Sequence, residues 1–334
     1  MLTKFISRRL IFYTLALFVI CVLVSLNLLL RSQILVIDSN AEVPTEIIAS
    51  FPISVDPDSK TIISNEDLLE SFYTEALATN SQSENNWWNK VAAVLVDKSW
   101  YQNLASSVSR IVVIWPGERK EEVAKHIGDI LRWSNTDRQE FMRLMDAEKP
   151  VLKEGKYFPG QYVTHRHATP EDIHTLIYSS FMNEVLDRYS DEVASVVPLE
   201  DALTIASLIE REASDFDNMR EVSGVIWNRL FIDMPLQLDA TLQYARGSDY
   251  RESEWWPKPV PRDKFIDSAY NTYQNAGLPP APIANPSAES ILAALNPVVT
   301  DCLFYFHRNN GDYHCSITYE EHVEKLRDFY GQGS

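Results

Sequence analysis

The most regular feature of the hydrophobic pattern is an uncharged, apolar segment near the N-terminus. Residues 10–30 carry no charged side chain, and Lys4, Arg8 and Arg9 precede them. A helix of this length rises roughly 30 Å, about the thickness of a bilayer's hydrocarbon core. Because the basic residues lie on its N-terminal side, we expect a retained transmembrane helix whose N-terminus stays in the cytoplasm.

Two alternatives to an anchor fit this segment less well. A cleaved signal peptide would have a shorter apolar run and a small-residue cleavage site, and no such site follows Leu30. A buried core helix is rarely so long and flanked by basic residues. The segment therefore predicts a single-pass protein of the plasma (inner) membrane, with its bulk outside the cytoplasm.

The pattern changes after residue 105. Residues 110–115 are rich in β-branched side chains and predict a strand, and Pro116-Gly117 predicts a turn. Apolar residues then recur at helical spacing, at Val123, Ile127, Ile130 and Leu131. Residues 154–163 read as an extended connector, and a further helix starts at Thr169-Pro170.

The C-terminal block predicts mostly helices. Pro198 suits a first helical turn, and the helix it starts runs to about Ala213. Further helices are expected at 219–231, 289–296 and 319–330, with a long loop over 250–287. Together with the strands, these elements predict an α+β protein.

Residues 302–319 predict a β-hairpin that contains two of the three cysteines. Asn310-Gly311 is a favoured two-residue turn, and this register pairs Phe306 with Cys315. Cys302 and Cys315 would then lie about four residues apart along the ladder, roughly 13 Å. We therefore expect both cysteines to be unpaired, although an exported chain favours disulfides.

Composition and motifs exclude several classes of function. The 334 residues carry a net charge of −17, which argues against nucleic acid as a partner because phosphate binding needs a basic face. The chain contains no H-E-x-x-H, no G-x-S-x-G, no Walker loop and no Cys/His set with zinc spacing. No metal or cofactor is indicated.

Residues 203–214, LTIASLIEREAS, place two glutamates in an apolar helix. On a helical wheel, Glu210 and Glu212 lie on opposite flanks of the apolar arc, and only Thr204 and Arg211 mark a solvent face. A carboxyl group in apolar surroundings has a raised pKa and can act as a general acid near neutral pH. The wheel does not choose between the two glutamates, and two ordinary surface glutamates also fit it.

The segments IASLIEREAS, SGVIWNRL, PLQLDATLQYA and YNTYQNAGLPPAPIANPSAESILAALNP resemble the catalytic domain of the endolytic murein transglycosylases, the MltG/YceG-like family. These blocks span roughly residues 200–325 in the family's order. Upstream, VVIWPGERKEEVAKHIGDIL and EGKYFPGQY are similar to the family's LysM-like subdomain and connector. Residues 31–105 match poorly.

The resemblance implies Glu210 as the catalytic acid. It also implies that further residues line or brace a glycan groove: Asn228, Gln237, Asp239, Thr241, Asn271, Tyr273 and Asn285. The chain departs from the family at residues 158–162, which read F-P-G-Q-Y in place of F-P-D-T-Y. It also has Ala281 and Ser287 where glycine is common, and Cys315 at an often aromatic position.

The organisation expected from pattern and resemblance has five parts. They are a cytoplasmic tail (1–9), a transmembrane helix (10–30), an accessory region (31–105), a small LysM-like α/β subdomain with its connector (106–165) and a mixed α+β catalytic domain (166–334). The implied partners are peptidoglycan glycan strands, the membrane and cell-wall synthesis proteins.

The implied reaction needs a single carboxyl group. A glycoside hydrolase usually needs two carboxylates, whereas a lytic transglycosylase uses the substrate's own 6-hydroxyl as nucleophile and leaves a 1,6-anhydro end. One glutamate then serves as acid and afterwards as base. A lysozyme-like hydrolase and a non-catalytic, membrane-anchored glycan-binding scaffold are the alternatives.

Overall fold

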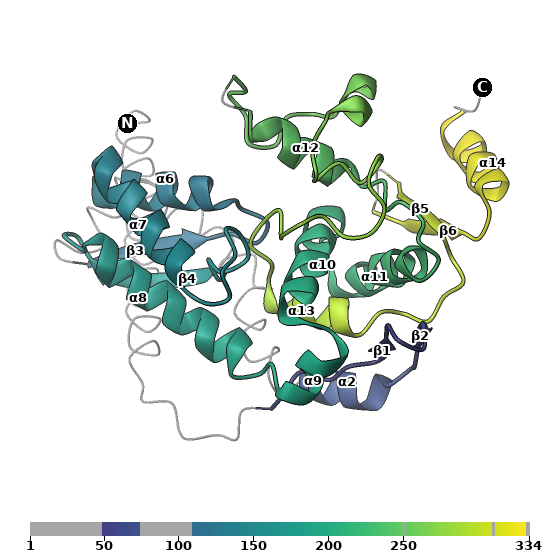
Figure 1. Cartoon of the computed structure of the whole chain (residues 1–334), viewed down its shortest axis with the longest axis horizontal. Coiled ribbons are helices and arrows are strands. Elements are labelled where there is room, and N and C mark those ends of the chain that lie inside the picture. Colours follow the sequence, from purple (N-terminus) through teal and green to yellow (C-terminus); the bar gives the residue numbers. More distant parts are fainter. Residues whose placement is uncertain (1–48, 74–108, 250, 309–310, 332–334) are drawn as a thin grey trace, which may run out of the picture.

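The structure is a computed structural model that describes residues 49–73, 109–249, 251–308 and 311–331. It is an α+β protein with two hydrophobic cores, which form the two lobes visible in Figure 1. The predicted transmembrane helix, and most of region 31–105, lie outside the described residues. Within the described ranges, every helix is too short or too polar to cross a bilayer.

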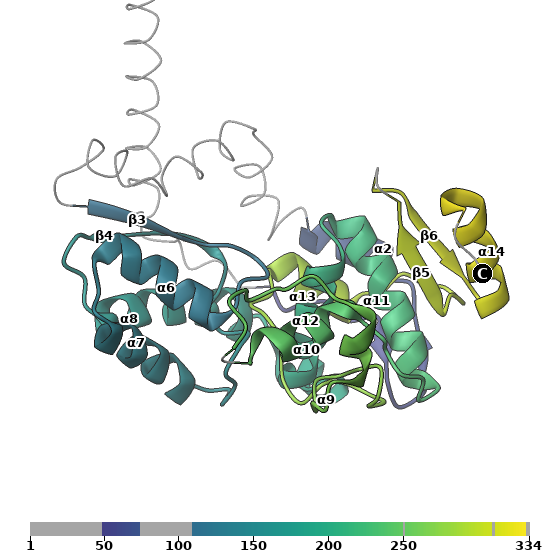
Figure 2. The same cartoon turned by 90° about the horizontal axis from the view of Figure 1, so that it is seen from above.

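The first lobe has the order strand, helix, helix, strand, followed by a long helix. Its elements are β3 (Ser109–Ile114), α6 (Lys120–Leu131), α7 (Asn135–Ala147), β4 (Gly160–His165) and α8 (Pro170–Phe181). The strands are antiparallel, with Ile111 opposite Val163, and Figure 2 shows α6, α7 and α8 together on one side of this pair. The strand predicted at residues 110–115 is confirmed as β3, and the helix predicted from Val123 to Leu131 is confirmed as α6.

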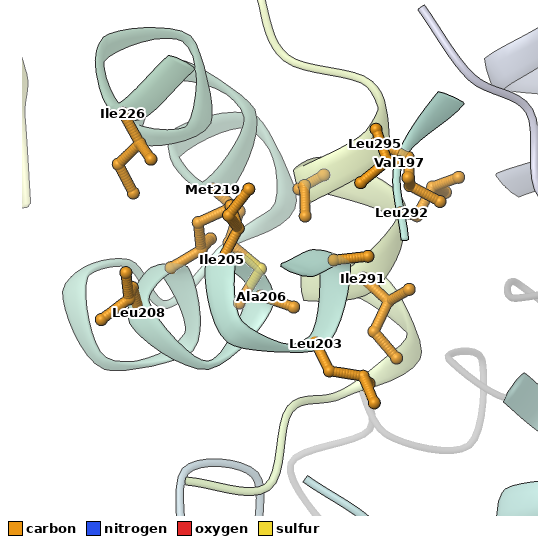
Figure 3. Close-up of a cluster of buried hydrophobic side chains, with 14 of the residues drawn as sticks. Val197, Leu203, Ile205, Ala206, Leu208, Met219, Ile226, Ile291, Leu292 and Leu295 are labelled. Atoms are coloured by element: carbon orange, nitrogen blue, oxygen red, sulfur yellow. The ribbon is translucent and has the colours of Figure 1, made fainter. Parts of the chain in front are cut away.

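The second lobe is built mainly of helices around α10. Its elements are α2 (Glu66–Phe72), α9 (Asp191–Val196), α10 (Leu199–Glu212), α11 (Phe216–Phe231), α12 (Asp239–Gly247), the 3-10 turn η3 (Pro261–Phe265) and α13 (Ala288–Leu295). A two-stranded ladder, β1 (Val55–Asp56) with β2 (Thr61–Ile62), lies beside α2. Helices α10, α11 and α13 pack against one another, and Figure 3 shows Leu203 of α10 beside Ile291 of α13.

Helix α10 is buried almost all round, which corrects the predicted solvent face. Every side chain from Ala202 to Ile209 is buried, including Thr204 with 3% exposure. The Thr204 hydroxyl donates to the carbonyl of Glu200 (2.7 Å), so a polar side chain is satisfied inside the helix and needs no water. The apolar wheel therefore defines a central helix with its two glutamates in the last turn.

Helix α8 belongs to both cores. Ile173 and Ile177 are fully buried in the first core, whereas Phe181 lies in the second. A π-helical turn, η2 (Met182–Leu186), continues the helix and buries Val185 in the second core. The two lobes are thus joined by one continuous helical rod as well as by loops.

The C-terminal hairpin forms as predicted, but its register is one residue different. Strands β5 (Phe304–His307) and β6 (Tyr313–Ser316) pair Tyr305 with Cys315. The ladder extends to a bond from the Arg308 N–H to the Asp312 carbonyl (2.9 Å), so three residues connect the strands and not two. Helix α14 (Tyr319–Tyr330) follows with the predicted bounds.

The prediction of unpaired cysteines is wrong, because Cys302 and Cys315 form a disulfide with a Cα–Cα distance of 5.8 Å. The expected separation assumed a straight strand through Cys302. Instead the strand begins at Phe304, and the preceding chain is tied down by the Asn228 amide, which donates to the Cys302 carbonyl (3.1 Å). This bend brings Cys302 across to β6.

Candidate active site

Glu210 lies in the last turn of α10, at the N-terminal end of α13. Ser287 caps α13 and donates twice to the same carboxyl oxygen of Glu210. Its backbone N–H is 2.9 Å from Oε2, and its hydroxyl is 2.6 Å from Oε2. The carboxyl group is thus held by the start of a helix, where backbone N–H groups and the helix dipole favour negative charge.

Burial and hydrogen bonding act in opposite directions on Glu210. Burial raises its pKa above the ordinary value, and this effect exceeds the lowering by Ser287, Ser290 and the charge of Arg211. The protonated form therefore persists to higher pH than in a free glutamate. This is the environment that a general acid needs near neutral pH.

A turn of the first lobe packs directly on this glutamate. Gly117 has φ +79°, and a Cβ added there would lie 3.2 Å from the Arg211 side chain and 3.7 Å from Cγ of Glu210. Only a glycine combines this backbone conformation with so close an approach. The Pro116-Gly117 turn thus forms one wall beside Glu210, although it is 94 residues away from Arg211 in the sequence.

The loop between α12 and η3, here called the aromatic loop because it carries Trp255 and Trp256, completes the surroundings of Arg211. The Arg211 guanidinium carbon lies 3.8 Å from the ring centroid of Trp256, which is a cation–π contact. The Trp256 indole N–H in turn donates to the Glu122 carboxylate in α6 (2.9 Å). Arg211, predicted to face solvent, instead links α10 to this loop, and through it to the first lobe.

Glu212 occupies a separate polar site on the other flank of α10. The Tyr305 hydroxyl donates to its carboxylate (3.0 Å), and the Tyr273 hydroxyl donates to the nearby Asp239 (2.8 Å). Burial raises the pKa of Glu212, and the charge of Asp239 adds to this effect. Glu210 and Glu212 thus have different hydrogen-bond partners, Ser287 and Tyr305, on the two flanks of α10.

The other predicted groove residues divide into braces and exposed groups. Asn271, Thr241 and Asn285 are fully buried, and their side chains bond to neighbouring loops and helices. The side-chain amide of Asn228 is also hydrogen-bonded within the protein, because it donates to the carbonyls of Thr300 and Cys302. Gln237 and Asp239 are exposed, and Tyr273 is half-buried.

Gln237 is held in an unusual backbone conformation on this surface. Its φ is +52°, a value uncommon for residues other than glycine. Its N–H donates to the carbonyl of Thr272 (3.0 Å), which fixes the segment that leads into α12. Gln237, Asp239 and Tyr273 therefore gather on the Glu212 flank, whereas Ser287 and Gly117 flank Glu210.

Sequence reasoning missed two contacts of Glu210 and Arg211. Ser287 stood out only as a departure from glycine, and nothing in the local pattern showed that its hydroxyl meets a residue 77 positions earlier. Trp256 lies in a loop without periodicity. In the part of the chain that the structure describes, no three His, Cys, Asp or Glu side chains are grouped so that they could hold a metal ion.

An α+β protein with a half-buried glutamate, Glu210, at the junction of two lobes is the class that this fold and site define. The family model described as "YceG-like family" matches residues 81–328. The chain therefore belongs to the YceG-like family.

Relatives and a solved structure agree with this assignment. An endolytic murein transglycosylase of Bacillus subtilis (strain 168) is 37% identical over 179 residues, which are 53% of this chain and 48% of that protein. One of Streptococcus pneumoniae serotype 2 (strain D39 / NCTC 7466) is 31% identical over 50% of this chain and 30% of that protein. The chain thus matches about half or less of the length of these relatives.

The crystal structure of a yceG-like protein of Listeria monocytogenes is similar over most of the fold. The TM-score is 0.55 at 27% sequence identity, and the match covers 83% of this chain and 98% of that one.

Proposed function

We propose that the protein is an endolytic lytic transglycosylase that cleaves the β-1,4 bond between N-acetylmuramic acid and N-acetylglucosamine in peptidoglycan. The observation that carries this proposal is the half-buried carboxyl group of Glu210 at the junction of the two lobes, which has a raised pKa and accepts two hydrogen bonds from Ser287. Membership of the YceG-like family and the names of the relatives support it.

In the proposed reaction, Glu210 acts first as an acid and then as a base. Its proton passes to the departing N-acetylglucosamine oxygen as the glycosidic bond breaks. The 6-hydroxyl of the same muramyl residue attacks the anomeric carbon, and its proton passes to the Glu210 carboxylate. The products are a new N-acetylglucosamine end and a 1,6-anhydromuramyl end, with no net change in the protonation of the enzyme. Because the attack is intramolecular, it benefits from proximity.

The separation of the two glutamates favours this route over hydrolysis. A lysozyme-like hydrolase would use a second carboxylate across the scissile bond from the first. Glu212 lies on the opposite flank of α10, where its carboxylate accepts from the Tyr305 hydroxyl, whereas the carboxyl group of Glu210 accepts from Ser287. The exposed Gln237 and Asp239 and the half-buried Tyr273 are proposed to bind hydroxyl and N-acetyl groups, with Asn228, Thr241, Asn271 and Asn285 bracing the groove.

Mass spectrometry of the products tests this function. Purified glycan strands are incubated with the full chain, and the new ends are identified by mass. Anhydro ends, lighter than hydrolytic ends by one water, are expected. Reducing ends would indicate the hydrolase, and intact strands that still bind the protein would indicate a scaffold.

We further propose that residues 10–30 anchor the protein in the plasma membrane, with residues 1–9 in the cytoplasm and both lobes outside. The uncharged segment and its basic flank support this orientation. The strand–helix–helix–strand order of the first lobe supports a LysM-like subdomain, and cell-wall synthesis proteins are proposed partners. Protease added outside spheroplasts should degrade both lobes, and full protection would contradict the orientation.

A further inference from the structure

We infer that Ser287 is a positioning residue that occupies Oε2 of Glu210 and so assigns both proton transfers to the other oxygen, Oε1. This inference rests on the proposed function. The geometry behind it is the convergence of two donors from one residue on one oxygen, at 2.9 Å from the backbone N–H and 2.6 Å from the hydroxyl. Neither donor contacts Oε1.

The same arrangement suits both protonation states of the glutamate. When the group is ionised, Oε2 accepts two charge-assisted hydrogen bonds. When it is protonated, a proton on Oε1 leaves Oε2 as the carbonyl oxygen, which still accepts both bonds. A proton on Oε2 would compete with the two donors. The carboxyl group can thus lose and regain its proton without changing its orientation.

Ser287 is itself fixed, because its role as the cap of α13 determines where its oxygen lies. The Ser287 oxygen accepts from the N–H of Ser290 (3.1 Å), and the Ser290 hydroxyl donates to the Ser287 carbonyl (2.9 Å). The first turn of a core helix therefore aims the hydroxyl at Glu210. The Ser287 hydroxyl has two acceptors within reach, and the carboxyl oxygen of Glu210 at 2.6 Å is closer than the hydroxyl oxygen of Ser290 at 3.3 Å.

Few charged groups among the described residues lie close to the hydrogen bonds between Ser287 and Glu210. Arg211 is the charged group that shifts the pKa of Glu210, and Ser290 is the further hydroxyl that does so. In the turn of the first lobe, Gly117 approaches the glutamate, and the carboxylate of Glu118 accepts from the backbone N–H of Trp115 (2.9 Å). In the aromatic loop, Trp256 faces Arg211.

The decisive variant is Ser287→Gly in the full chain. Glycine costs only a few tenths of a kcal/mol as a helix N-cap relative to serine, so the fold is retained while the hydroxyl is removed. Ser287→Thr keeps the hydroxyl and should restore the wild-type behaviour. Ser134→Ala, which removes the cap of α7 and has no contact with Glu210, is the matched control for the loss of a capping serine.

Two readouts separate positioning from a merely structural role. In Ser287→Gly, kcat should fall roughly ten-fold with little change in KM, because the carboxyl group is less well oriented. The alkaline limb of the kcat/KM profile should move to higher pH, because the lost donor favoured the ionised form. Ser287→Thr and Ser134→Ala should show neither change.

An NMR titration makes the test independent of activity. The 13C carboxyl resonance of Glu210, assigned as the one missing in Glu210→Gln, should titrate at higher pH in Ser287→Gly than in wild type. An unchanged titration together with an unchanged pH profile would overturn the inference. A shifted titration in a protein that forms no anhydro ends would show that the contact exists and that the proposed function is wrong.

Discussion

The side chain of Asn285 holds two lobes together through the backbone of Glu118. Its amide N–H donates to the Glu118 carbonyl (2.8 Å), and so does its own backbone N–H (2.9 Å). Its side-chain oxygen accepts from the N–H groups of Gly155 and Tyr157 at 2.9 and 3.0 Å. The fully buried side-chain amide of Asn285 thus provides hydrogen-bond partners both for the turn beside Glu210 and for the connector.

Asn285→Ala should therefore destabilise the protein and also reduce activity. The change leaves buried N–H groups without partners, and we expect the free energy of unfolding to fall by about 2–4 kcal/mol. Activity should fall further than the unfolded fraction explains, because the Gly117 turn loses its support. Urea denaturation measures the first effect. The exposed Asn275, changed to Ala, is the control; an equal loss in both variants would contradict this role.

Glu210→Gln should abolish the formation of anhydromuramyl ends, whereas Glu212→Gln should leave measurable activity. Glutamine keeps the size of the side chain but cannot give or take the proton, a contribution typically worth about 100- to 10,000-fold. Thermal melting of the Glu210 variant should stay near wild type, since no cavity opens. Near-wild-type turnover in Glu210→Gln would remove the basis of the catalytic assignment, and if both variants kept it the scaffold would be favoured.

The Cys302–Cys315 disulfide should stabilise the C-terminal hairpin. It closes a loop with a sequence separation of 13 residues, for which the chain-entropy relation gives about 3 kcal/mol. Alkylation before reduction should leave both cysteines unlabelled in peptide mass maps, and Cys315→Ser should lower the melting temperature. Labelling of both thiols in the folded, non-reduced chain would show that the bridge does not form.

Glu154 should make the stability of the fold depend on pH. It is 1% exposed, and burial, together with the charge of Glu121, raises its pKa well above the ordinary value of 4.5. The stability that the protonated, buried Glu154 contributes is therefore present in full below the pKa that Glu154 has in the unfolded chain. It is lost as the pH rises through the pKa that Glu154 has in the folded protein. Glu154→Gln stays neutral, so its stability relative to wild type should increase from near pH 4.5 to about pH 8.

Urea denaturation at the two pH values measures this difference. The exposed Glu254, changed to Gln, serves as the control. A difference between wild type and Glu154→Gln that is the same at both pH values would contradict the prediction.

The sequence predicted the elements whose signals are local. Helix α14 and helix α10 have the expected bounds to within a residue: Thr318 caps α14, and Pro198 directly precedes α10. Helix α7 was not predicted, although Ser134 and Asp137 form a capping box at its start. The face of α10 was misjudged at Thr204, since a helical wheel counts a hydroxyl as polar even when the preceding turn satisfies it.

The site depended on contacts that spacing does not reveal. Periodicity placed Glu210 and Glu212 on two flanks but could not distinguish them, because both are half-buried at the edge of the apolar arc. Their partners, Ser287 and Tyr305, come from residues 77 and 93 positions later. The disulfide was missed for a related reason: the loop is one residue longer than the Asn310-Gly311 turn implied, and the chain bends before the strand.

The shared helix α8 limits how far the two lobes are interchangeable modules. A cut after residue 165 would separate Ile173 and Ile177 from the first core that they complete. A cut after α8 would instead take Phe181 away from the second. Recombination between members of the family should therefore be tolerated best when α8 and both lobes are inherited together, so the unit that evolution can exchange is larger than either lobe.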